Sequence, residues 1–462
     1  MSIIASISGI RGTIGGKPGE ALTPLDLVKY AAAYGTWIAQ QHPKNKRIVL
    51  GRDARISGEM VRHIVVGTLQ SVGVSVIDIG LATTPTVEMA IPDEQAAGGI
   101  ILSASHNPKQ WNALKLLNNL GEFISDADGQ AILQIITSNN FDFVSVDHLG
   151  SYETKTGYLD KHINKILALP LVDVAAIKKS KFKILVDGIN SVGGIAIPAL
   201  LRALGVEQIV EMYCTPDGKF AHNPEPLPEN LATVSMELKR VKADLGIVVD
   251  PDADRLAIIN EDGTMFGEEY TLVAVADYVL QNKKGTTVSN LSSTRTLKEI
   301  TEKMGCQYHA AAVGEVNVVA KMKEVNAIIG GEGNGGIIYP ELHYGRDALV
   351  GVALFLSYLA KFGKSCSALR QKYPNYYMYK GKIELSSQTD IDLILQRLRE
   401  RYKNQPISTI DGVRIEFNGD WIHLRKSNTE PIVRIYAESS SQVIAEAIVK
   451  QIHQEMRNFL PK

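Results

Sequence analysis

The chain has 462 residues, which suggests three or more domains of ~150 residues each. Hydrophobic residues make up 45% and charged residues 21% of it, an ordinary mixture for a globular protein. Lysine and arginine total 49 against 50 aspartates and glutamates, so the overall charge favours neither nucleic acid nor a membrane as a partner. Any anion-binding site must therefore be local.

Cysteine usage and apolar runs favour a cytoplasmic protein. The three cysteines, Cys214, Cys306 and Cys366, are far apart and form no C-x-x-C pair, so neither disulfides nor a zinc site is expected. The first residues lack the basic region and the cleavage site of a secretory signal. The longest apolar stretch, 348–360, is shorter than the ~18 residues that a membrane span needs.

The predicted strands share one pattern, a short β-branched run that ends in a turn with glycine or aspartate. Four such runs are RIVLGRD at 47, KILVDG at 183, LGIVVDPD at 245 and NAIIGGEG at 326. Helical patterns lie between them, at 25–41, 194–204 and 269–280. Alternating buried strands and helices predict α/β layers. The loops at the carboxyl ends of such strands carry function, and all four runs end in such a loop.

The end of the chain follows a different pattern. GKIELSS, GVRIEFNGDWIHLRKSN and IVRIYAES alternate as strands do, and a helix is expected over 441–458. This pattern predicts a small α+β end domain. With seams near 150, 255 and 372, the expected domains are 1–150, 151–255, 256–371 and 372–462.

Several basic residues lie in short motifs near the N-terminus. Arg11 lies between glycines in SGIRGTIG, and Arg52 and Arg55 lie in GRDARISG. Each alone is typical of a surface charge on a turn. Lys115, a single lysine in NALKL, carries equally little information by itself.

A serine and a histidine are adjacent in GGIILSASHNPKQWNALKL, which begins at residue 98. An apolar run stops at Ser105 and His106, and Asn107-Pro108 then predict a turn. Neighbouring residues of an extended chain point to opposite faces, so His106 is poorly placed to take a proton from Ser105. The serine therefore needs a role other than that of a histidine-activated nucleophile.

Three aspartates, Asp250, Asp252 and Asp254, directly follow a buried strand in VVDPDADRLAII. Alternate residues of an extended loop can turn three carboxylates to one side, and such oxygen ligands suit Mg²⁺ or Ca²⁺. An EF-hand does not fit, because its sixth loop position should be glycine and is Arg255, and because the flanks have strand character. A solvated acidic turn is the alternative, but the position after a buried strand favours a metal site.

A glycine-rich loop occurs in IIGGEGNGGIIYP, where Gly331, Gly333 and Gly336 form a literal G-x-G-x-x-G. A dinucleotide site requires a helix directly afterwards, and IIYP has strand character and a proline instead. What remains is a backbone-rich loop with one carboxylate, Glu332, and one amide, Asn334. These groups suit sugar hydroxyls, and a plain glycine turn is the alternative.

A cluster of polar and basic side chains occurs in LRKSNTEPIVRIYAES near the C-terminal end. Its members are Arg425, Lys426, Ser427, Asn428, Thr429 and Arg434. Guanidinium groups, hydroxyls and free backbone N–H groups around one turn make a phosphate cradle. A polar hairpin loop is the alternative, which the two flanking arginines make less favourable.

Together these stretches resemble the α-D-phosphohexomutase family, in the family's order and over nearly the whole chain. SASHNP resembles its phosphoserine loop, DPDADR its metal loop, GEGNGG its sugar-binding loop and RKSNTEP its phosphate-binding loop. PDGKFAHNPEPLPENL at 216 is a further similar segment. The resemblance implies three similar α/β domains with mixed, mostly parallel sheets, and a smaller α+β C-terminal domain, around a central cleft.

The resemblance also implies roles for the phosphoryl-transfer residues. Ser105 would be phosphorylated in the resting enzyme and would carry the phosphoryl group. One Mg²⁺ per chain would be held by a phosphate oxygen on Ser105 and by the three aspartates: Asp250, Asp252 and Asp254. The residues that position the phosphate and neutralise its charge would be Arg11, Lys115 and Arg255.

The implied reaction moves phosphate reversibly between C6 and C1 of a hexose, in a monomer or a homodimer. A sugar 1-phosphate would take the phosphoryl group at O6, and the resulting 1,6-bisphosphate, which is also the activator, would turn over and return its other phosphate to Ser105. Glu332 and Asn334 would hold the sugar hydroxyls. The non-reacting phosphate would be bound by Arg425, Ser427, Asn428, Thr429 and Arg434.

Two departures from the family pattern concern the sugar. Bacterial members usually carry Gly-Glu-x-Ser-Gly-His, and here Asn334 and Gly336 replace the serine and the histidine. Glu315, in AVGEVNV, stands where phosphoglucomutase/phosphomannomutase enzymes carry a histidine. Both departures argue against the phosphomannomutase/phosphoglucomutase branch, and GEGNGG with VGEVNV resembles phosphoglucosamine mutases more closely. A nearby carboxylate such as Glu315 would also favour a 2-amino group.

The expected reaction is therefore the conversion of glucosamine 6-phosphate to glucosamine 1-phosphate. Phosphomannomutase/phosphoglucomutase activity is the alternative within the family. A metal-dependent sugar phosphatase is a rival of another class, although it needs no second phosphate cradle. A non-catalytic sugar-phosphate binder would not need Ser105 and three aspartates together.

Overall fold

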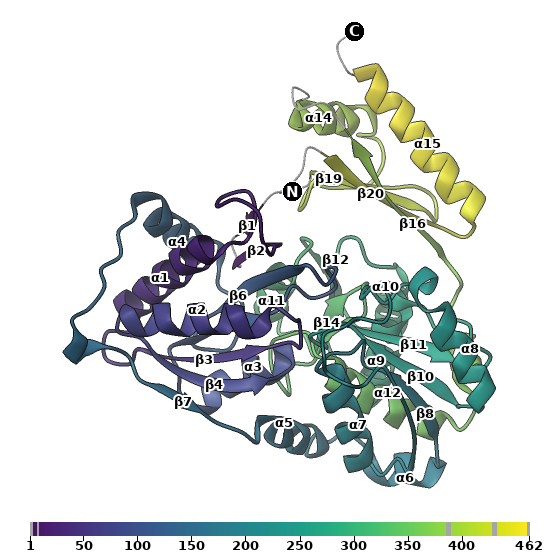
Figure 1. Cartoon of the computed structure of the whole chain (residues 1–462). Coiled ribbons are helices and arrows are strands. Elements are labelled where there is room, and N and C mark those ends of the chain that lie inside the picture. The colour runs from purple at the N-terminus through teal and green to yellow at the C-terminus, as the bar shows by residue number, and fades with distance from the viewer. Residues whose placement is uncertain (1–2, 7–8, 385–389, 427–431, 460–462) are drawn as a thin grey trace. The chain divides into compact units, whose positions relative to one another are not determined.

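The computed structural model describes four stretches of the chain: residues 3–6, 9–384, 390–426 and 432–459. Their strands and helices are labelled in Figure 1 where there is room. Within these stretches, no helix is long and apolar enough to cross a membrane. Three members of the predicted phosphate cradle, Ser427, Asn428 and Thr429, lie outside the described residues.

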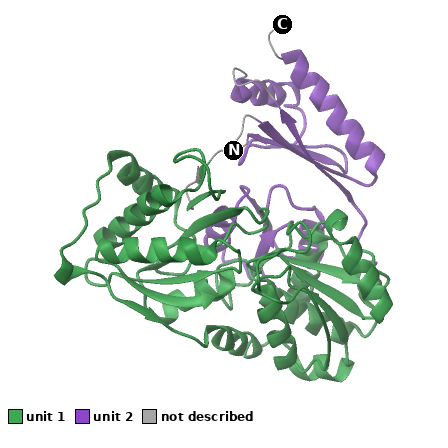
Figure 2. Cartoon of the chain, viewed as in Figure 1, with its two compact units in different colours: residues 1–283, 334–370 green, residues 284–333, 371–462 purple. Residues whose placement is uncertain are grey.

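The chain divides into two compact units, which are coloured separately in Figure 2. Unit 1 consists of residues 1–283 and 334–370, and unit 2 consists of residues 284–333 and 371–462. Each unit is therefore built from two separate segments of the chain. This division places the serine and the aspartates in unit 1, and Glu332 and the cradle arginines in unit 2.

The first sheet of unit 1 has seven strands among the described residues, in the order β1-β2-β6-β5-β3-β4-β7. β5, β3, β4 and β7 pair in parallel, whereas β1, β2 and β6 join the edge antiparallel. The bounds are β1 Ile4–Ser6, β2 Gly9–Thr13, β3 Arg47–Arg52, β4 Ser75–Leu81, β5 Gly98–Leu102, β6 Trp111–Leu117 and β7 Tyr152–Thr154. β5 is buried along its whole length, as a strand covered on both faces should be.

Four helices between residues 24 and 138 pack around this sheet (Figure 1). They are α1 Pro24–Gln41, α2 Gly58–Ser71, α3 Thr84–Asp93 and α4 Asp126–Ser138. α1 begins at a capping box in which Thr23 and Asp26 satisfy each other's backbone amides, with Pro24 in its first turn. α3 begins where the Thr83 hydroxyl accepts the amide of Thr86, and this start places Thr84 beside the site described below.

The second sheet of unit 1 has the described order β11-β10-β8-β9. β10 pairs in parallel with β8 and β8 with β9, whereas β11 runs antiparallel to β10. The strands are β8 Lys183–Asp187, β9 Gln208–Met212, β10 Leu245–Val249 and β11 Leu256–Asn260. The helices of this region are α5 Tyr158–Leu167, α6 Val174–Ser180, α7 Gly193–Ala203 and α8 Ala232–Val241, with 3₁₀ turns at Val146–His148 and Pro228–Asn230.

Unit 1 is completed by α9, β15, α12 and α13. Their bounds are α9 Glu268–Asn282, β15 Gly336–Ile338, α12 Ala348–Phe362 and α13 Cys366–Arg370. α12 is buried over most of its length and packs against α9, which explains why its sequence is apolar on every side. The apolar stretch at 348–360 is thus a core helix.

Unit 2 contains parallel strands β13, β12 and β14 and, further along the chain, an antiparallel sheet of described order β16-β20-β19-β18-β17. The first group is β12 Thr287–Asn290, α10 Thr296–Lys303, β13 Tyr308–Ala311, α11 Glu315–Glu324 and β14 Ile329–Glu332. The second is β16 Tyr377–Glu384, α14 Ile391–Arg401, β17 Ile407–Ser408, β18 Val413–Glu416, β19 Trp421–Lys426, β20 Ile432–Ser439 and α15 Gln442–Phe459. The antiparallel sheet is the α+β end region that alternation predicted.

Candidate active site

Ser105 lies in the tight turn that follows β5, with a backbone φ of +48°. The amide of Asn107 donates to the carbonyl of Ala104 at 3.1 Å and closes this turn. The amide of Ser105 donates to Ser103 Oγ at 2.9 Å. A positive φ costs a residue with a Cβ about 1–2 kcal/mol, so the surrounding contacts must hold the serine in place.

The side chain of Arg55 provides these contacts. It is fully buried and pairs with Asp53 at 3.0 Å, and the ring of Phe220 lies 5.1 Å from its guanidinium carbon. The guanidinium also donates to the carbonyls of Ser105 at 2.5 Å, Asn107 at 2.6 Å, Pro108 at 2.8 Å and Trp111 at 3.0 Å. The expectation of a surface charge is wrong for Arg55, because these acceptors compensate the burial of its charge.

The hydroxyl of Ser105 is directed at the aspartate loop. It donates to Asp250 Oδ2, with 2.6 Å between the oxygens. His106 Nδ1 lies 3.4 Å from Ser105 Oγ, so the two side chains do not point to opposite faces. That expectation assumed an extended chain, and it is wrong because the φ of Ser105 is positive. Because the contact with Asp250 is shorter, Asp250 and not the imidazole ring accepts the hydrogen bond of the serine hydroxyl.

The three aspartates follow β10 and are fully buried. Their carboxylates lie together, with one oxygen from each residue within 4.8 Å of the others. The loop turns rather than extends, because Ala253 has a φ of +54°. Asp250 Oδ1 stabilises this turn by accepting the amides of Asp254 and Arg255, each at 3.2 Å. The carboxylates therefore meet through a turn and not through the alternation of an extended loop.

Two of the buried carboxylate oxygens suit a cation. Asp252 Oδ1 and Asp254 Oδ1 receive no hydrogen bond from any described residue. Burial of such an oxygen without a hydrogen bond is costly, and a bound ion compensates that cost. A set of carboxylate and hydroxyl oxygens is the donor set that Mg²⁺, Ca²⁺ and Mn²⁺ prefer. The residues present therefore fit the predicted metal.

The charges of this loop shift two carboxylate pKa values in opposite directions. Burial, followed by the charges of Asp254 and Asp252, raises the pKa of Asp250 well above its usual value. Burial alone would also raise the pKa of Asp252, but the ammonium of Lys115 outweighs it and lowers that pKa. Both shifts reflect carboxylates held close together away from water, where an added positive charge is stabilising.

Positive side chains approach the aspartates from separate elements. Lys115, on β6, places Nζ 2.5 Å from Asp252 Oδ2 and 3.3 Å from Asp254 Oδ2. Arg255 Nε lies 4.0 Å from Asp254 Oδ1. Arg346, which precedes α12, places Nη2 2.8 Å from Asp254 Oδ2. Two of these cations were predicted site residues, and Arg346 was not.

Arg11 lies on the same face of the first sheet as Lys115. It is opposite Ala113 on β6, and Ala113 and Lys115 are two residues apart on one strand. The pKa of His106 is lowered well below its usual value, first by burial and then by the charges of Arg255, Arg11 and Arg346. His106 therefore lies near three positively charged side chains as well as the aspartates.

Sequence reasoning missed two residues that contact the aspartates, Thr84 and Arg346. The Thr84 hydroxyl donates to Asp252 Oδ2 at 2.6 Å, and its amide donates to the Asp252 carbonyl at 2.9 Å. No motif marks Thr84, because its partner is 168 residues away. No local motif marks Arg346 either, because Asp254 is 92 residues away.

Glu332 and Asn334, the predicted sugar-binding residues, belong to different units. In unit 2, Glu332 is buried at the end of β14, and its Oε1 accepts Asn290 Nδ2 at 2.8 Å and the amide of Gly314 at 3.1 Å. In unit 1, Asn334 Oδ1 accepts the amide of Gly336 at 3.2 Å. Their joint action on one sugar stays a prediction.

The described members of the predicted cradle are Arg425, Lys426 and Arg434, and Lys426 pairs with Asp392 at 3.1 Å. Arg425 on β19 lies directly opposite Arg434 on β20, which lies opposite Lys382 on β16. Residues directly opposite share a face, where like charges are destabilising unless they are compensated. Asp411 Oδ2 lies 3.6 Å from Arg425 Nε. Lys382 Nζ lies 2.9 Å from Glu384 Oε1, so carboxylates compensate part of this row of basic residues, and an anionic ligand would add to that compensation.

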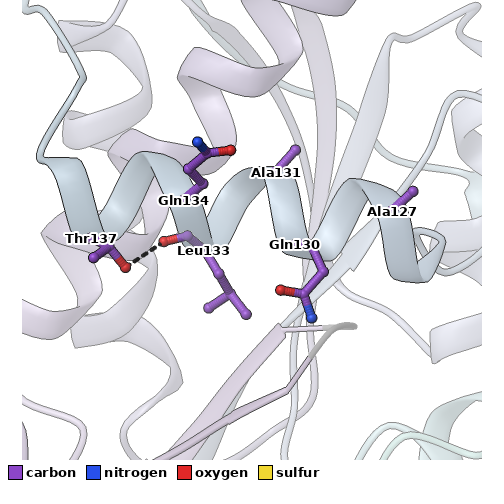
Figure 3. A pocket seen from close by; sticks show the side chains of 6 residues that line it. All are labelled: Ala127, Gln130, Ala131, Leu133, Gln134 and Thr137. Carbon is purple, nitrogen blue, oxygen red and sulfur yellow. Dashed lines mark hydrogen bonds between the residues drawn. The ribbon is translucent and has the colours of Figure 1, made fainter.

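A shallow hollow lies along α4 (Figure 3). Its lining is Ala127, Gln130, Ala131, Leu133, Gln134 and Thr137. The Thr137 hydroxyl donates to the Leu133 carbonyl at 2.9 Å within the same helix. These side chains carry no charge, so this hollow offers little to a phosphate and is not the candidate site.

Comparison with protein-family models matches four successive domains of phosphoglucomutase/phosphomannomutase. They are α/β/α domain I over 4–143, domain II over 160–263, domain III over 267–377 and the C-terminal domain over 384–455. A phosphoglucomutase/phosphomannomutase of Thermococcus kodakarensis is 35% identical over 437 residues, which cover 93% of this chain and 94% of that one. A phosphoglucosamine/phosphogalactosamine mutase of Sulfurisphaera tokodaii is 33% identical and covers 98% of both chains.

A solved structure of a phosphoglucomutase/phosphomannomutase family protein from Burkholderia thailandensis has a TM-score of 0.82 and 26% identity, with 98% of each chain covered. The class that fold and comparisons define is that of the phosphohexomutases. The chain belongs to the phosphoglucomutase/phosphomannomutase family. The predictions of the α-D-phosphohexomutase family, of a phosphohexomutase enzyme and of three α/β domains with an α+β end domain are thereby confirmed.

Proposed function

We propose that this chain transfers phosphate between C6 and C1 of a hexose through a phosphorylated Ser105. The observation that carries the proposal is the hydroxyl of Ser105, which lies 2.6 Å from Asp250 at the edge of a buried aspartate cluster. The phosphoryl group on Ser105 passes to O6 of a sugar 1-phosphate, and the Oγ–P bond breaks as the O6–P bond forms. The 1,6-bisphosphate turns over, and Ser105 Oγ takes the phosphoryl group from O1, so that the O1–P bond breaks as the Oγ–P bond forms again.

Four oxygen-bearing residues would hold one Mg²⁺ in this site: Ser105, Asp250, Asp252 and Asp254. When bound there, Mg²⁺ withdraws charge from the transferring phosphoryl group. The chain's own cations act on the same charge, because phosphoryl transfer depends mainly on positioning and electrostatic stabilisation. These cations are Arg11, Lys115 and Arg255.

The second phosphate of the intermediate needs a separate anion site, which we assign to Arg425 and Arg434 together with Ser427, Asn428 and Thr429. The row of basic residues opposite one another supports this role. A simple sugar phosphatase would not need such a site. Dependence of the turnover rate on added sugar 1,6-bisphosphate separates the mutase from the phosphatase, which releases inorganic phosphate without it.

The preferred sugar is proposed to be glucosamine phosphate. Glu315, buried at the start of α11, supplies a carboxylate that attracts a 2-amino group. The relative from Sulfurisphaera tokodaii is named for amino sugars, and the one from Thermococcus kodakarensis for glucose and mannose. The names of the relatives therefore leave both candidate sugars open, and the carboxylate is what favours glucosamine.

The sugar proposal predicts a higher kcat/KM for glucosamine phosphate than for glucose or mannose phosphate. All three are measured on one preparation, each with its matching 1,6-bisphosphate as primer. Glu315→Gln keeps the size of the side chain and removes its charge, so it should lower the preference for glucosamine and leave glucose turnover nearly unchanged. A glucosamine value well below the other two rejects this sugar and leaves the mutase assignment intact.

Asp252→Asn tests the metal assignment, because it removes one charged ligand at constant size. We expect turnover to fall roughly 10²-fold or more, since a charge that stabilises the transition state is lost. Asp262→Asn is the matched control: Asp262 lies in the turn after β11, where it accepts from Thr264 and not from any site residue. Undiminished turnover in excess EDTA, or by Asp252→Asn, would refute the metal site.

Other expectations from the sequence stay predictions: the phosphosugar as partner, a monomer or homodimer, the cytoplasmic location and the four domain limits. One observation bears on the limit at 255. β11 continues the sheet of β10 beyond that residue, to Asn260. The bisphosphate activator is likewise proposed from the family resemblance and is tested by the primer experiment.

A further inference from the structure

Arg346 contacts the aspartate loop from a position 92 residues further along the chain. Its Nη2 lies 2.8 Å from Asp254 Oδ2, and the residue is 8% exposed. The same Asp254 leaves its other oxygen, Oδ1, without a hydrogen bond from any described residue. The guanidinium therefore binds one oxygen of the carboxylate, Oδ2, which Lys115 Nζ also approaches at 3.3 Å, whereas Oδ1 has only the Arg255 Nε at 4.0 Å nearby.

The backbone around Arg346 is held by a buried network. The residue forms an antiparallel bridge with Ile338. The next residue, Asp347, caps α12 through its Oδ1, and its Oδ2 lies 2.9 Å from His162 Nε2 and 3.3 Å from His343 Nε2. These contacts from separate elements fix the point at which the arginine side chain starts.

A glycine makes room for the arginine side chain. A Cβ at Gly336 would lie 2.4 Å from Cδ and 3.1 Å from Cγ of Arg346, too close for both to remain. The absence of a side chain at Gly336 therefore allows Arg346 to reach Asp254.

We infer that Arg346 is a positioning residue for the metal ligand Asp254, and that Gly336 permits it. The guanidinium fixes Oδ2, so that Oδ1 is presented to the divalent cation. The inference rests on the metal site of the proposed function, but not on the sugar or on the phosphoserine.

Mn²⁺ binding to the metal-free full chain tests the inference without any turnover. Mn²⁺ prefers the same oxygen ligands as Mg²⁺, and electron paramagnetic resonance counts the free ion. We expect the dissociation constant for Mn²⁺ to rise about tenfold in Arg346→Ala, as it commonly does when a partner behind a ligand is lost. Arg346→Lys, which keeps a donor and the charge, should lose less.

The sign of this change separates positioning from a plain effect of charge. If Arg346 acted merely as a cation near the ion, its removal would relieve repulsion and tighten Mn²⁺ binding. Tighter or unchanged binding in Arg346→Ala therefore overturns the inference. Arg240→Ala is the matched control, because Arg240 forms an exposed pair with Glu237 on α8.

The role of Gly336 is tested by a double-mutant cycle. Gly336→Ala keeps the arginine but displaces its flexible end, so it should weaken Mn²⁺ binding by a factor similar to that of Arg346→Ala. The double variant should bind no worse than Arg346→Ala alone, because both changes remove one contact. Gly67→Ala, which adds a methyl to open space on α2, is the control.

Two results of the cycle would overturn the inference: binding by Gly336→Ala that equals wild type, or factors that multiply in the double variant. Thermal midpoints of all variants are recorded, so that misfolded protein is recognised. Failure of the proposed hexose reaction is visible separately, as a wild-type chain that binds Mn²⁺ but turns over no sugar phosphate. The two failures are therefore distinguishable.

Discussion

Replacing Ser105 with alanine is expected to abolish mutase turnover, by at least about 10³-fold, because the group that carries the phosphate is lost. The fold should survive, since Arg55 contacts the carbonyl of Ser105 and not its side chain. The same carbonyl is present in alanine. Bisphosphate-primed turnover and thermal melting, measured together, check both parts of this prediction.

Mass spectrometry provides an independent readout of the same residue. Intact wild-type protein should show a partial phosphate adduct that maps to residues 98–116, and Ser105→Ala should lack it. Ser105→Gly is a useful second variant, because glycine relieves the cost of the positive φ and still has no hydroxyl. Full mutase activity in either variant would disprove the mechanism.

Replacing Arg55 with alanine is expected to destabilise the chain by about 3–5 kcal/mol, because Asp53 would be left buried without its partner. The four carbonyls that the guanidinium contacts would lose their donors as well. Urea midpoints report the overall loss, and hydrogen exchange of residues 98–116 reports the local one. The stability of Arg55→Lys should lie between those of the wild type and of Arg55→Ala, because an ammonium has fewer donors in a less suitable geometry.

Arg52→Ala is the control for this prediction, since Arg52 lies three residues earlier and pairs with Glu59, an exposed carboxylate. The Arg52 side chain is 13% exposed and that of Glu59 is 54% exposed, so this pair is more accessible to water than the pair of Arg55 with Asp53 and should contribute less. Equal destabilisation by the two alanine variants would mean that the buried contacts of Arg55 contribute no more to stability than the pair of Arg52 with Glu59. Unchanged hydrogen exchange at residues 98–116 in Arg55→Ala would contradict the claim that Arg55 stabilises the turn that carries Ser105.

The features of this chain that could be predicted are those that depend on residues close together in the sequence. Strands that end in glycine or aspartate turns were expected at the positions of β3, β8, β10 and β14, because burial and turn chemistry are local. The grouping of Asp250, Asp252 and Asp254 was expected for the same reason. The expected mechanism of that grouping was wrong, since nothing in the residue pattern marks the positive φ of Ala253.

The features that escaped prediction depend on partners far apart in the chain. The burial of Arg55 follows from acceptors about 50 positions away, such as the carbonyl of Ser105. The contact between Arg346 and Asp254 joins residues that are 92 positions apart. A single arginine in a short motif carries no information about such distant acceptors, so a surface charge was the natural expectation.

The separation of Asp254 and Arg346 has a consequence for the biosynthesis of the protein. At roughly 5–20 residues per second, a ribosome reaches Arg346 about 5–18 s after it has added Asp254. During that interval the nascent chain carries the serine, the aspartates and Lys115 without this guanidinium. The segment made in between includes residues 284–333, which belong to the other unit. The aspartate site therefore cannot reach its final set of contacts until translation has passed through part of unit 2 and returned to unit 1.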